Sequence, residues 1–249
     1  MWTFFHKLGS PPHFYRLSLL FSPWFAIPGY LLIAWGTYQG LFVAPEDYQQ
    51  RDAFRIIYVH VPAAYLAQMT YAIMAVSAGI GLIWRMKLAH AVAAAAAPIG
   101  ASFCILMLVT GSIWGRPMWG TWWEWGDPRL MSALILLFLY FGLIAMRSSI
   151  TDTAKADKAC AILALVGAVN LPIIRFSVDW WTSLHQSATI IRKGGPAMDA
   201  EMLWPLLANL LGFSLVFGAV LLRRIRTEVL YRERRKRWVR DLVLGDGAP

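Results

Sequence analysis

Tryptophan is concentrated in one short stretch of the chain, WGRPMWGTWWEWGDPRL at residues 114–130. Aromatic belts at a membrane–water boundary account for one or two tryptophans at such a place, but not for this density. The stretch therefore predicts a flat, rigid aromatic surface that suits a large planar ligand. Its five tryptophans, of 13 in the chain, are Trp114, Trp119, Trp122, Trp123 and Trp125, and Gly120 follows the second of them.

Two histidines could supply metal ligands near this surface. His60 lies in YVHVPAAY, and His185 lies in VDWWTSLHQ. Neutral imidazole is a common metal ligand, and haem iron can take axial histidines. The pair is therefore a candidate six-coordinate haem site. The alternative is that each histidine forms hydrogen bonds within the protein or meets lipid head groups, and their spacing does not decide between these interpretations.

Several arginines have matching chemistry. Arg116 and Arg129 flank the tryptophans, and Arg55 lies near the end of an apolar segment, as does Arg175. Guanidinium groups bind carboxylates such as haem propionates in a bidentate manner, although interfacial anchoring or pairing with a nearby aspartate is equally compatible with the sequence. Asp127 directly precedes Pro128, which predicts that it caps the next helix.

The composition predicts the elements that must position these residues. Of 249 residues, 58% are apolar and 15% are charged, whereas a soluble domain has roughly 25% charged residues. We therefore expect an all-α, polytopic membrane bundle that forms a single domain over residues 1–249, with a basic cytoplasmic tail at about 223–249. The apolar run at 17–42 is too long for a cleaved signal.

Six segments are apolar and long enough to cross a bilayer. The fifth contains Asn170 and Pro172, which predict a kink whose freed backbone group finds a partner inside the bundle. The six predicted transmembrane helices are 17–39, 56–84, 89–113, 130–147, 159–178 and 203–222.

The positive charges predict the orientation of these spans. Sixteen of the 23 Lys and Arg residues fall on one side, nine of them in the tail, and seven fall on the other. Both termini should then be cytoplasmic, with the tryptophans, His60 and His185 on the outer face. This distribution explains the net charge of +9 through topology and contact with membrane lipid, so nucleic-acid binding is not expected.

Other motifs limit the chemistry. Cys104 and Cys160 form neither a CxxC nor a CxxCH motif, so we expect two structural thiols and no covalently attached haem. The sequence lacks GxxxxGK[ST], so it does not predict ATP hydrolysis by a P-loop.

The tryptophan-rich segment WGTWWEWGD resembles the WGxxWxWD signature of the haem-handling membrane proteins of cytochrome c biogenesis. Further stretches resemble one branch, the haem exporter protein C family, and the resemblance extends from near the N-terminus to about residue 240. These stretches are APEDYQQ, RIIYVHVPAA, VTGSIWGRPMWGTWW and VNLPIIRFSVDWWTSLHQ.

The resemblance implies a haem carrier rather than an enzyme. Such proteins bind haem b non-covalently at the periplasmic side of the bacterial inner membrane and pass it to a periplasmic haem chaperone. They act with the ATPase and membrane subunits of an ABC transporter and with a small single-span subunit. The family's axial histidines correspond to His60 and His185. Here Gly126 separates Trp125 from Asp127, whereas in the family pattern the acid follows the last tryptophan directly.

Two other functions are compatible with parts of the sequence. An integral b-type cytochrome in quinone-linked electron transfer also needs histidine-ligated haem, but stacked haems usually need four histidines in the bundle and none is predicted at the membrane centre. A transporter of a small solute needs a polar site near the midplane. Apart from Asn170, the spans offer little for such a site.

Overall fold

The computed structural model describes residues 9–185, 195–196 and 198–245, and within these ranges the regular structure is helical. Six helical segments are long and apolar enough to cross a membrane. The predicted all-α, six-span architecture is therefore confirmed. The elements are α2 (Pro11–Tyr38), the π-helix η1 (Gln39–Val43), the 3₁₀-helix η2 (Asp52–Ile56), α3 (Ile57–Trp84), α4 (Lys87–Trp119), α5 (Pro128–Ser149), α6 (Thr153–Gly167), α7 (Asn170–Trp180), α8 (Ala200–Arg232) and α9 (Arg237–Leu244).

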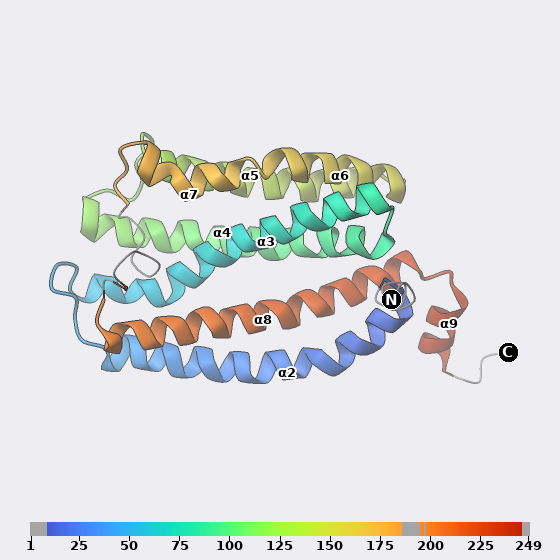
Figure 1. Ribbon diagram of the computed structural model, residues 1–249, viewed down its shortest axis with the longest axis horizontal. Coiled ribbons are helices and arrows are strands. Elements are labelled where there is room, and N and C mark those ends of the chain that lie inside the picture. Colours follow the sequence, from blue (N-terminus) through green and yellow to red (C-terminus); the bar gives the residue numbers. More distant parts are fainter. Residues whose placement is uncertain (1–8, 186–194, 197, 246–249) are drawn as a thin grey trace.

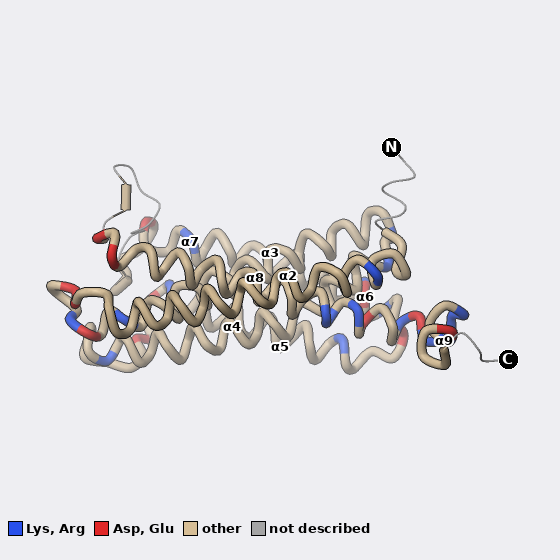
Figure 2. Tube along the Cα trace, turned by 90° about the horizontal axis from the view of Figure 1, so that it is seen from below, with Lys and Arg blue, Asp and Glu red and all other residues tan. Residues whose placement is uncertain are grey.

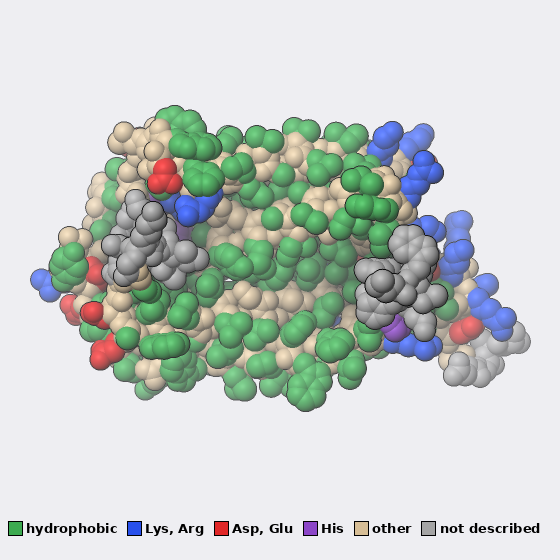
Figure 3. Space-filling model, in the orientation of Figure 1, with side chains coloured by type: hydrophobic (Ala, Val, Ile, Leu, Met, Phe, Trp, Pro, Cys, Tyr) green, Lys and Arg blue, Asp and Glu red, His purple; other side chains and the backbone are tan. Residues whose placement is uncertain are grey.

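The surface of the bundle is that of a multi-pass membrane protein. Charged residues gather toward its two ends, and the middle of the tube is uncharged (Figure 2). Apolar side chains cover the long side of the bundle that faces the viewer in Figure 3. Trp24 and Ile83 are each 71% exposed. So much exposed apolar area needs a covering, which a bilayer provides.

The helices lie in three rows, with α5, α6 and α7 in one, α3 and α4 in the next, and α2 with α8 in the third (Figure 1). Helix α4 contacts α3, α5 and α8, and helix α3 contacts α4, α6 and α8, so these two helices are central to the bundle. Helix α2 packs mainly on α8, where Gly29 and Gly212 allow the backbones to approach. The start of α2 and the end of α8 lie at the same end of the bundle.

The fifth span is interrupted at the place where the sequence predicted a kink. Helix α6 ends at Gly167 and α7 begins at Asn170. The Nδ2 group of Asn170 donates a 2.8 Å hydrogen bond to the backbone oxygen of Ser132 in α5. The hydrogen bond inside the bundle is thus made by the side chain of Asn170, and not by a freed backbone group as the sequence predicted. It holds the two halves of the span against α5.

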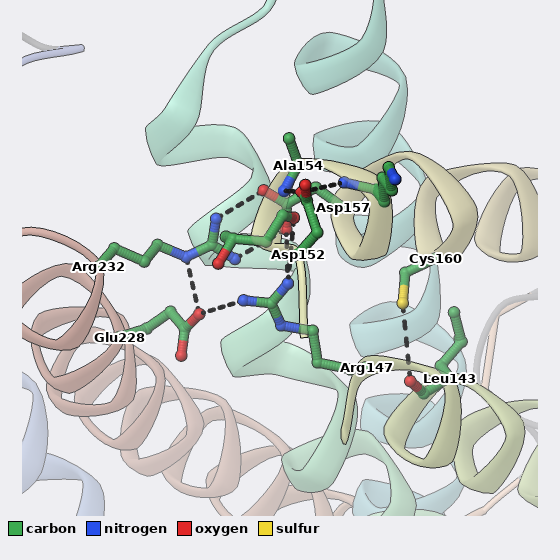
Figure 4. Close-up of polar contacts among 10 residues, drawn as sticks. Leu143, Arg147, Asp152, Ala154, Asp157, Cys160, Glu228 and Arg232 are labelled. Carbon is green, nitrogen blue, oxygen red and sulfur yellow. Dashed lines mark hydrogen bonds and ion pairs between the residues drawn. The ribbon is translucent and has the colours of Figure 1, made fainter. Parts of the chain in front are cut away.

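An ionic cluster connects the C-terminal end of α8 to α5 and α6 (Figure 4). Arg232 contacts Asp157 at 2.7 Å and Glu228 at 2.7 Å. Arg147 contacts the same two acids, at 3.2 and 3.4 Å. The first part of the predicted basic tail is therefore a continuation of α8, and α9 follows it.

Candidate functional site

The first part of the tryptophan-rich stretch is helical, although the third predicted span ended at residue 113, which left residues 114–129 as a loop. Helix α4 continues through Pro117 to Trp119. Gly120 then adopts a left-handed conformation with φ of 77°, and its N–H bonds to the Arg116 oxygen. Glycine tolerates this conformation and commonly ends helices in this way. A proline near the helix end removes only one donor, so α4 extends beyond the apolar segment and carries Trp114 and Trp119.

Two of the tryptophan rings, those of Trp123 and Trp125, do not form the flat surface that the sequence predicted. The rings of Trp123 and Trp125 meet at 66°, with their centroids 5.9 Å apart. This edge-to-face arrangement is the one that aromatic quadrupoles favour. Trp122 and Trp125 are 58% and 72% exposed, and the buried Nε1 of Trp123 has no partner among the described residues.

His60 lies in the first turn of α3 and faces the end of α4. Its Nδ1 atom is 2.9 Å from the hydroxyl oxygen of Thr110. Its ring lies edge-on to Trp114, with centroids 5.6 Å apart at 76°. The Nε1 group of Trp114 donates to Oε1 of Gln50 at 3.0 Å, so the segment before η2 also holds this tryptophan in place.

His185 follows α7 and reaches the same end of α4. Its ring centroid is 4.9 Å from that of Trp119. Burial, and then the nearby positive charge of Arg129, lower the pKa of His185 to about 4. The imidazole is therefore neutral at physiological pH, which is the form that binds metals.

The structure thus brings both predicted ligands to one end of one helix. Trp114 and Trp119 are five residues apart on α4, which corresponds to roughly 7.5 Å along the helix axis. In the ranges that the structure describes, no group of three or more His, Cys, Asp or Glu residues could hold a metal ion. Two imidazoles suit a metal that already has other ligands, such as the four nitrogens of a porphyrin.

Asp127 ties the end of the tryptophan-rich stretch to the segment of His185. Its Oδ1 accepts from the backbone N–H groups of Arg129 and Leu130, each at 2.9 Å, so the predicted helix cap is confirmed. Its Oδ2 accepts from the Ser183 hydroxyl and the Leu184 N–H, each at 2.8 Å. Burial acts to raise the pKa of Asp127, but these hydrogen bonds lower it below the ordinary value. This aspartate is 3% exposed, and a direct contact with a ligand stays a prediction.

The candidate arginines differ in how they are used. Arg55 pairs with Asp52 at 2.8 Å and donates to the backbone oxygens of Gly40 and Ala44. Arg116 donates to the backbone oxygen of Gly120. These contacts stabilise the ends of α2 and α4.

Arg129 is the candidate arginine whose charge acts on both histidines. Both His60 and His185 lie within electrostatic range of its guanidinium. Arg175, which lies within range of Arg129, adds a second positive charge. In the part of the chain that the structure describes, Arg129 forms no ion pair within 4.0 Å. This pair of arginines has the charge needed to receive carboxylates.

Residues 4–240 match the family described as Heme exporter protein C. The chain belongs to the Heme exporter protein C family. It is 47% identical to Heme exporter protein C of Escherichia coli (strain K12) over 248 residues, which cover 99% of each chain. It is 44% identical to the Haemophilus influenzae protein of that name over 243 residues, 98% of each chain. The Bradyrhizobium diazoefficiens protein of that name is 47% identical over 225 residues, 90% of this chain and 85% of that protein.

In this member of the Heme exporter protein C family, sequence reasoning missed the residues that hold the histidines. Thr110 and Ser183 are ordinary polar residues in the sequence, and their partners lie 50 and 56 residues away. Gly111 was also missed, although a Cβ atom there would lie 3.1 Å from Cε1 of His60. No local pattern marks such contacts, because they arise only when the helices pack.

A cavity of about 320 Å³ lies near the other end of this family member, away from the tryptophans. It is lined by His90, Cys160 and the ionic cluster at Arg147. The two cysteines are free, as the sequence predicted. The cavity was not predicted, and it does not include any residue of the candidate site.

Proposed function

We propose that this protein binds haem b non-covalently, with His60 and His185 as axial ligands, and presents it for transfer in c-type cytochrome biogenesis. The observation that carries the proposal is the meeting of both histidines with Trp114 and Trp119 at one end of α4, in a member of the Heme exporter protein C family. Haem is the cargo in this proposal, and the protein is a carrier rather than an enzyme.

The aromatic residues would hold the macrocycle. Exposed rings such as Trp122 and Trp125 offer apolar surface to a porphyrin edge or face. Burial of apolar area contributes about 25 cal/mol per Å² before the cost of ordering is subtracted. Arg129 and Arg175 would pair with the propionates, since guanidinium groups suit carboxylates. The contributions of Arg55 and Arg116 would be indirect, through the helix ends that they stabilise.

The charge distribution and the family support a proposal for the location and the partners. We place the protein in the bacterial inner membrane, with both termini cytoplasmic and the histidines at the periplasmic side. Haem would pass from there to a periplasmic haem chaperone. Because the chain has no P-loop motif, the energy of ATP would be supplied by ABC transporter subunits, which act together with a small single-span subunit.

Spectroscopy of the purified protein tests this function. We expect a low-spin b-type haem spectrum, with haem that acid–organic extraction releases. His60→Ala and His185→Ala should each convert the spectrum or lower haem content, by about tenfold for the stronger ligand. Loss of a residue that hydrogen-bonds to a metal-bound histidine already reduces metal affinity 10- to 100-fold. Loss of the ligand itself should therefore cost at least about tenfold.

His90→Ala is the matched control, because His90 lies near the start of α4, the opposite end from Trp119. Its spectrum and haem content should equal those of the unmodified protein. Unchanged spectra in both His60→Ala and His185→Ala would contradict the ligand assignment. Two haems per chain with rapid quinone reduction would instead support the electron-transfer alternative.

A further inference from the structure

We propose that the two histidines have unequal roles: His60 is the fixed ligand that retains haem, and His185 is the ligand that is exchanged when haem leaves. Thr110 is then a positioning residue that acts through His60. This inference rests on the proposed function. It follows from a difference between the hydrogen bonds available to the two imidazoles.

The His60 ring is held in one tautomer by Thr110. The Thr110 hydroxyl has one proton and lies 2.6 Å from the Leu106 oxygen and 3.2 Å from the Met107 oxygen, so it donates to the backbone of its own helix. It must therefore accept at the 2.9 Å contact with His60, and the proton of that contact belongs to Nδ1. Nε2 of His60 is left with a free lone pair, which is what a metal requires.

The orientation of the His60 ring is fixed as well. Gly111 leaves space beside it, since an added Cβ atom would lie 3.1 Å from Cε1. Trp114 meets the ring edge-on, and Gln50 holds Trp114. Residues of one turn of α4 therefore fix the position of the His60 ring. A ligand with fixed tautomer and orientation loses little freedom when it binds iron.

Within the part of the chain that the structure describes, His185 lacks such an acceptor. Its Nδ1 atom is buried and has no hydrogen-bond partner among the described residues, and the nearest Asp127 oxygen is 3.6 Å away. A carboxylate offers about four acceptor positions. In Asp127 these are filled by the N–H groups of Arg129, Leu130 and Leu184 and by the Ser183 hydroxyl. Asp127 therefore positions the backbone of the His185 segment without fixing the proton of the imidazole.

This difference makes one iron–nitrogen bond stronger than the other. A hydrogen bond from the second ring nitrogen makes a histidine a more basic ligand. If His185 binds iron through Nε2, its Nδ1–H stays buried with no acceptor among the described residues, which is unfavourable. The iron–His185 bond should therefore break first. Its electron pair returns to the imidazole, and a lone-pair donor of the acceptor protein occupies the vacated position, with no change in iron oxidation state.

Single-ligand variants test the inequality. Haem content per folded chain should fall at least about tenfold in His60→Ala, whereas His185→Ala should retain most of its haem in a high-spin form. Added imidazole should restore the low-spin spectrum of His185→Ala. Equal haem loss in both variants, or better retention in His60→Ala, would overturn the inference.

Substitution of Thr110 tests its positioning role independently of folding. Thr110→Val keeps the shape of the side chain and removes the hydroxyl, whereas Thr110→Ser keeps the hydroxyl and is the matched control. Because a less basic ligand stabilises ferric iron less, the haem reduction potential should rise in Thr110→Val and stay unchanged in Thr110→Ser. Equal potentials in Thr110→Val and the unmodified protein would refute the role of Thr110.

The two proposals can fail separately. Absence of bound haem from the unmodified protein, or spectra unaltered by either histidine substitution, would remove the proposed function. If both single-histidine variants lose haem to the same extent, the proposed function stands, and only the proposal of unequal roles for His60 and His185 is refuted.

Discussion

At the scale of single residues, the site is organised by side chains that need not touch the ligand. Asp127 uses four hydrogen bonds to join the start of α5 to the segment of His185. Thr110 orients the other histidine through one hydrogen bond. The extra Gly126 precedes Asp127 without preventing these contacts. Such outer partners influence both the orientation and the basicity of metal-binding histidines.

His185 should make the stability of the haem-free protein depend on pH. Its pKa is about 4 in the folded protein, against 6.5 for the unperturbed group, so the unfolded chain binds this proton more tightly. The stability associated with neutral His185 is complete above about pH 6.5 and is lost as the pH falls toward 4. A shift of this size corresponds to a loss on the order of 3 kcal/mol.

Unfolding of the haem-free protein in detergent, followed between pH 7 and 4, measures this effect. His185→Gln has no group that titrates there, so its stability should fall less steeply with decreasing pH. Parallel pH profiles for the variant and the unmodified protein would argue against the lowered pKa of His185.

At the scale of elements, the bundle depends on close helix contacts that small residues permit. Helix α2 contacts chiefly α8, and through α8 it reaches α3. Asn209 of α8 donates to the backbone oxygen of Tyr58 at 3.0 Å, two residues before His60. The contact between α2 and α8 therefore lies close to the element that carries the proposed fixed ligand.

Gly212→Ala should destabilise the packing of α2 on α8 by about 1–3 kcal/mol. The added Cβ atom would lie 2.9 Å from the Gly29 oxygen and 2.9 Å from the Ile33 nitrogen, and these backbone atoms cannot move independently of α2. Gly218→Ala is the control on the same helix, because its Cβ atom meets Phe25 at an ordinary 3.4 Å. Unfolding in detergent micelles compares the two variants, and equal stability would show that α2 and α8 separate at little cost.

At the scale of the whole molecule, the two ends of the bundle are chemically different. The histidines and the tryptophan-rich stretch lie at one end. The ionic cluster of Arg147, Asp157, Glu228 and Arg232 lies at the other end, with α9 beyond it (Figures 1 and 4). Positive residues favour the cytoplasmic side of a membrane. The ionic cluster itself is neutral, so the predicted orientation depends on the excess of Lys and Arg that the sequence assigns to that side.

Cysteine labelling tests the orientation in cells. In a chain whose two cysteines are replaced by alanine, Glu46→Cys should react with a membrane-impermeant maleimide from the periplasmic side. Thr151→Cys should react only after the membrane is disrupted. Both positions are exposed and lie at opposite ends of the bundle. The reverse pattern of labelling would show that the topology is inverted and that the histidines lie at the cytoplasmic side of the membrane.

The sequence was sufficient to predict the features that depend on local composition. Apolar segments of sufficient length have to form helices in a bilayer, because backbone polar groups must be satisfied internally, so all six spans could be predicted. Asp127 before Pro128 predicted a cap, and Asn170 with Pro172 predicted the interruption of the fifth span. The wrong expectations were the loop from residue 114 and the flat arrangement of rings, because neither helix extension nor ring orientation is a property of composition.

Tertiary structure decided which residues meet. His60 and Thr110 are 50 residues apart, and Asp127 and Leu184 are 57 apart, so their hydrogen bonds exist only because α3, α4, α5 and α7 pack together. The sequence alone predicted that two histidines and a group of tryptophans would serve a planar, metal-bearing ligand. The packing determined that the His60 imidazole has an acceptor for its proton, whereas the His185 Nδ1 atom has none among the described residues. Such hydrogen bonds depend on distances between elements that are remote in the chain.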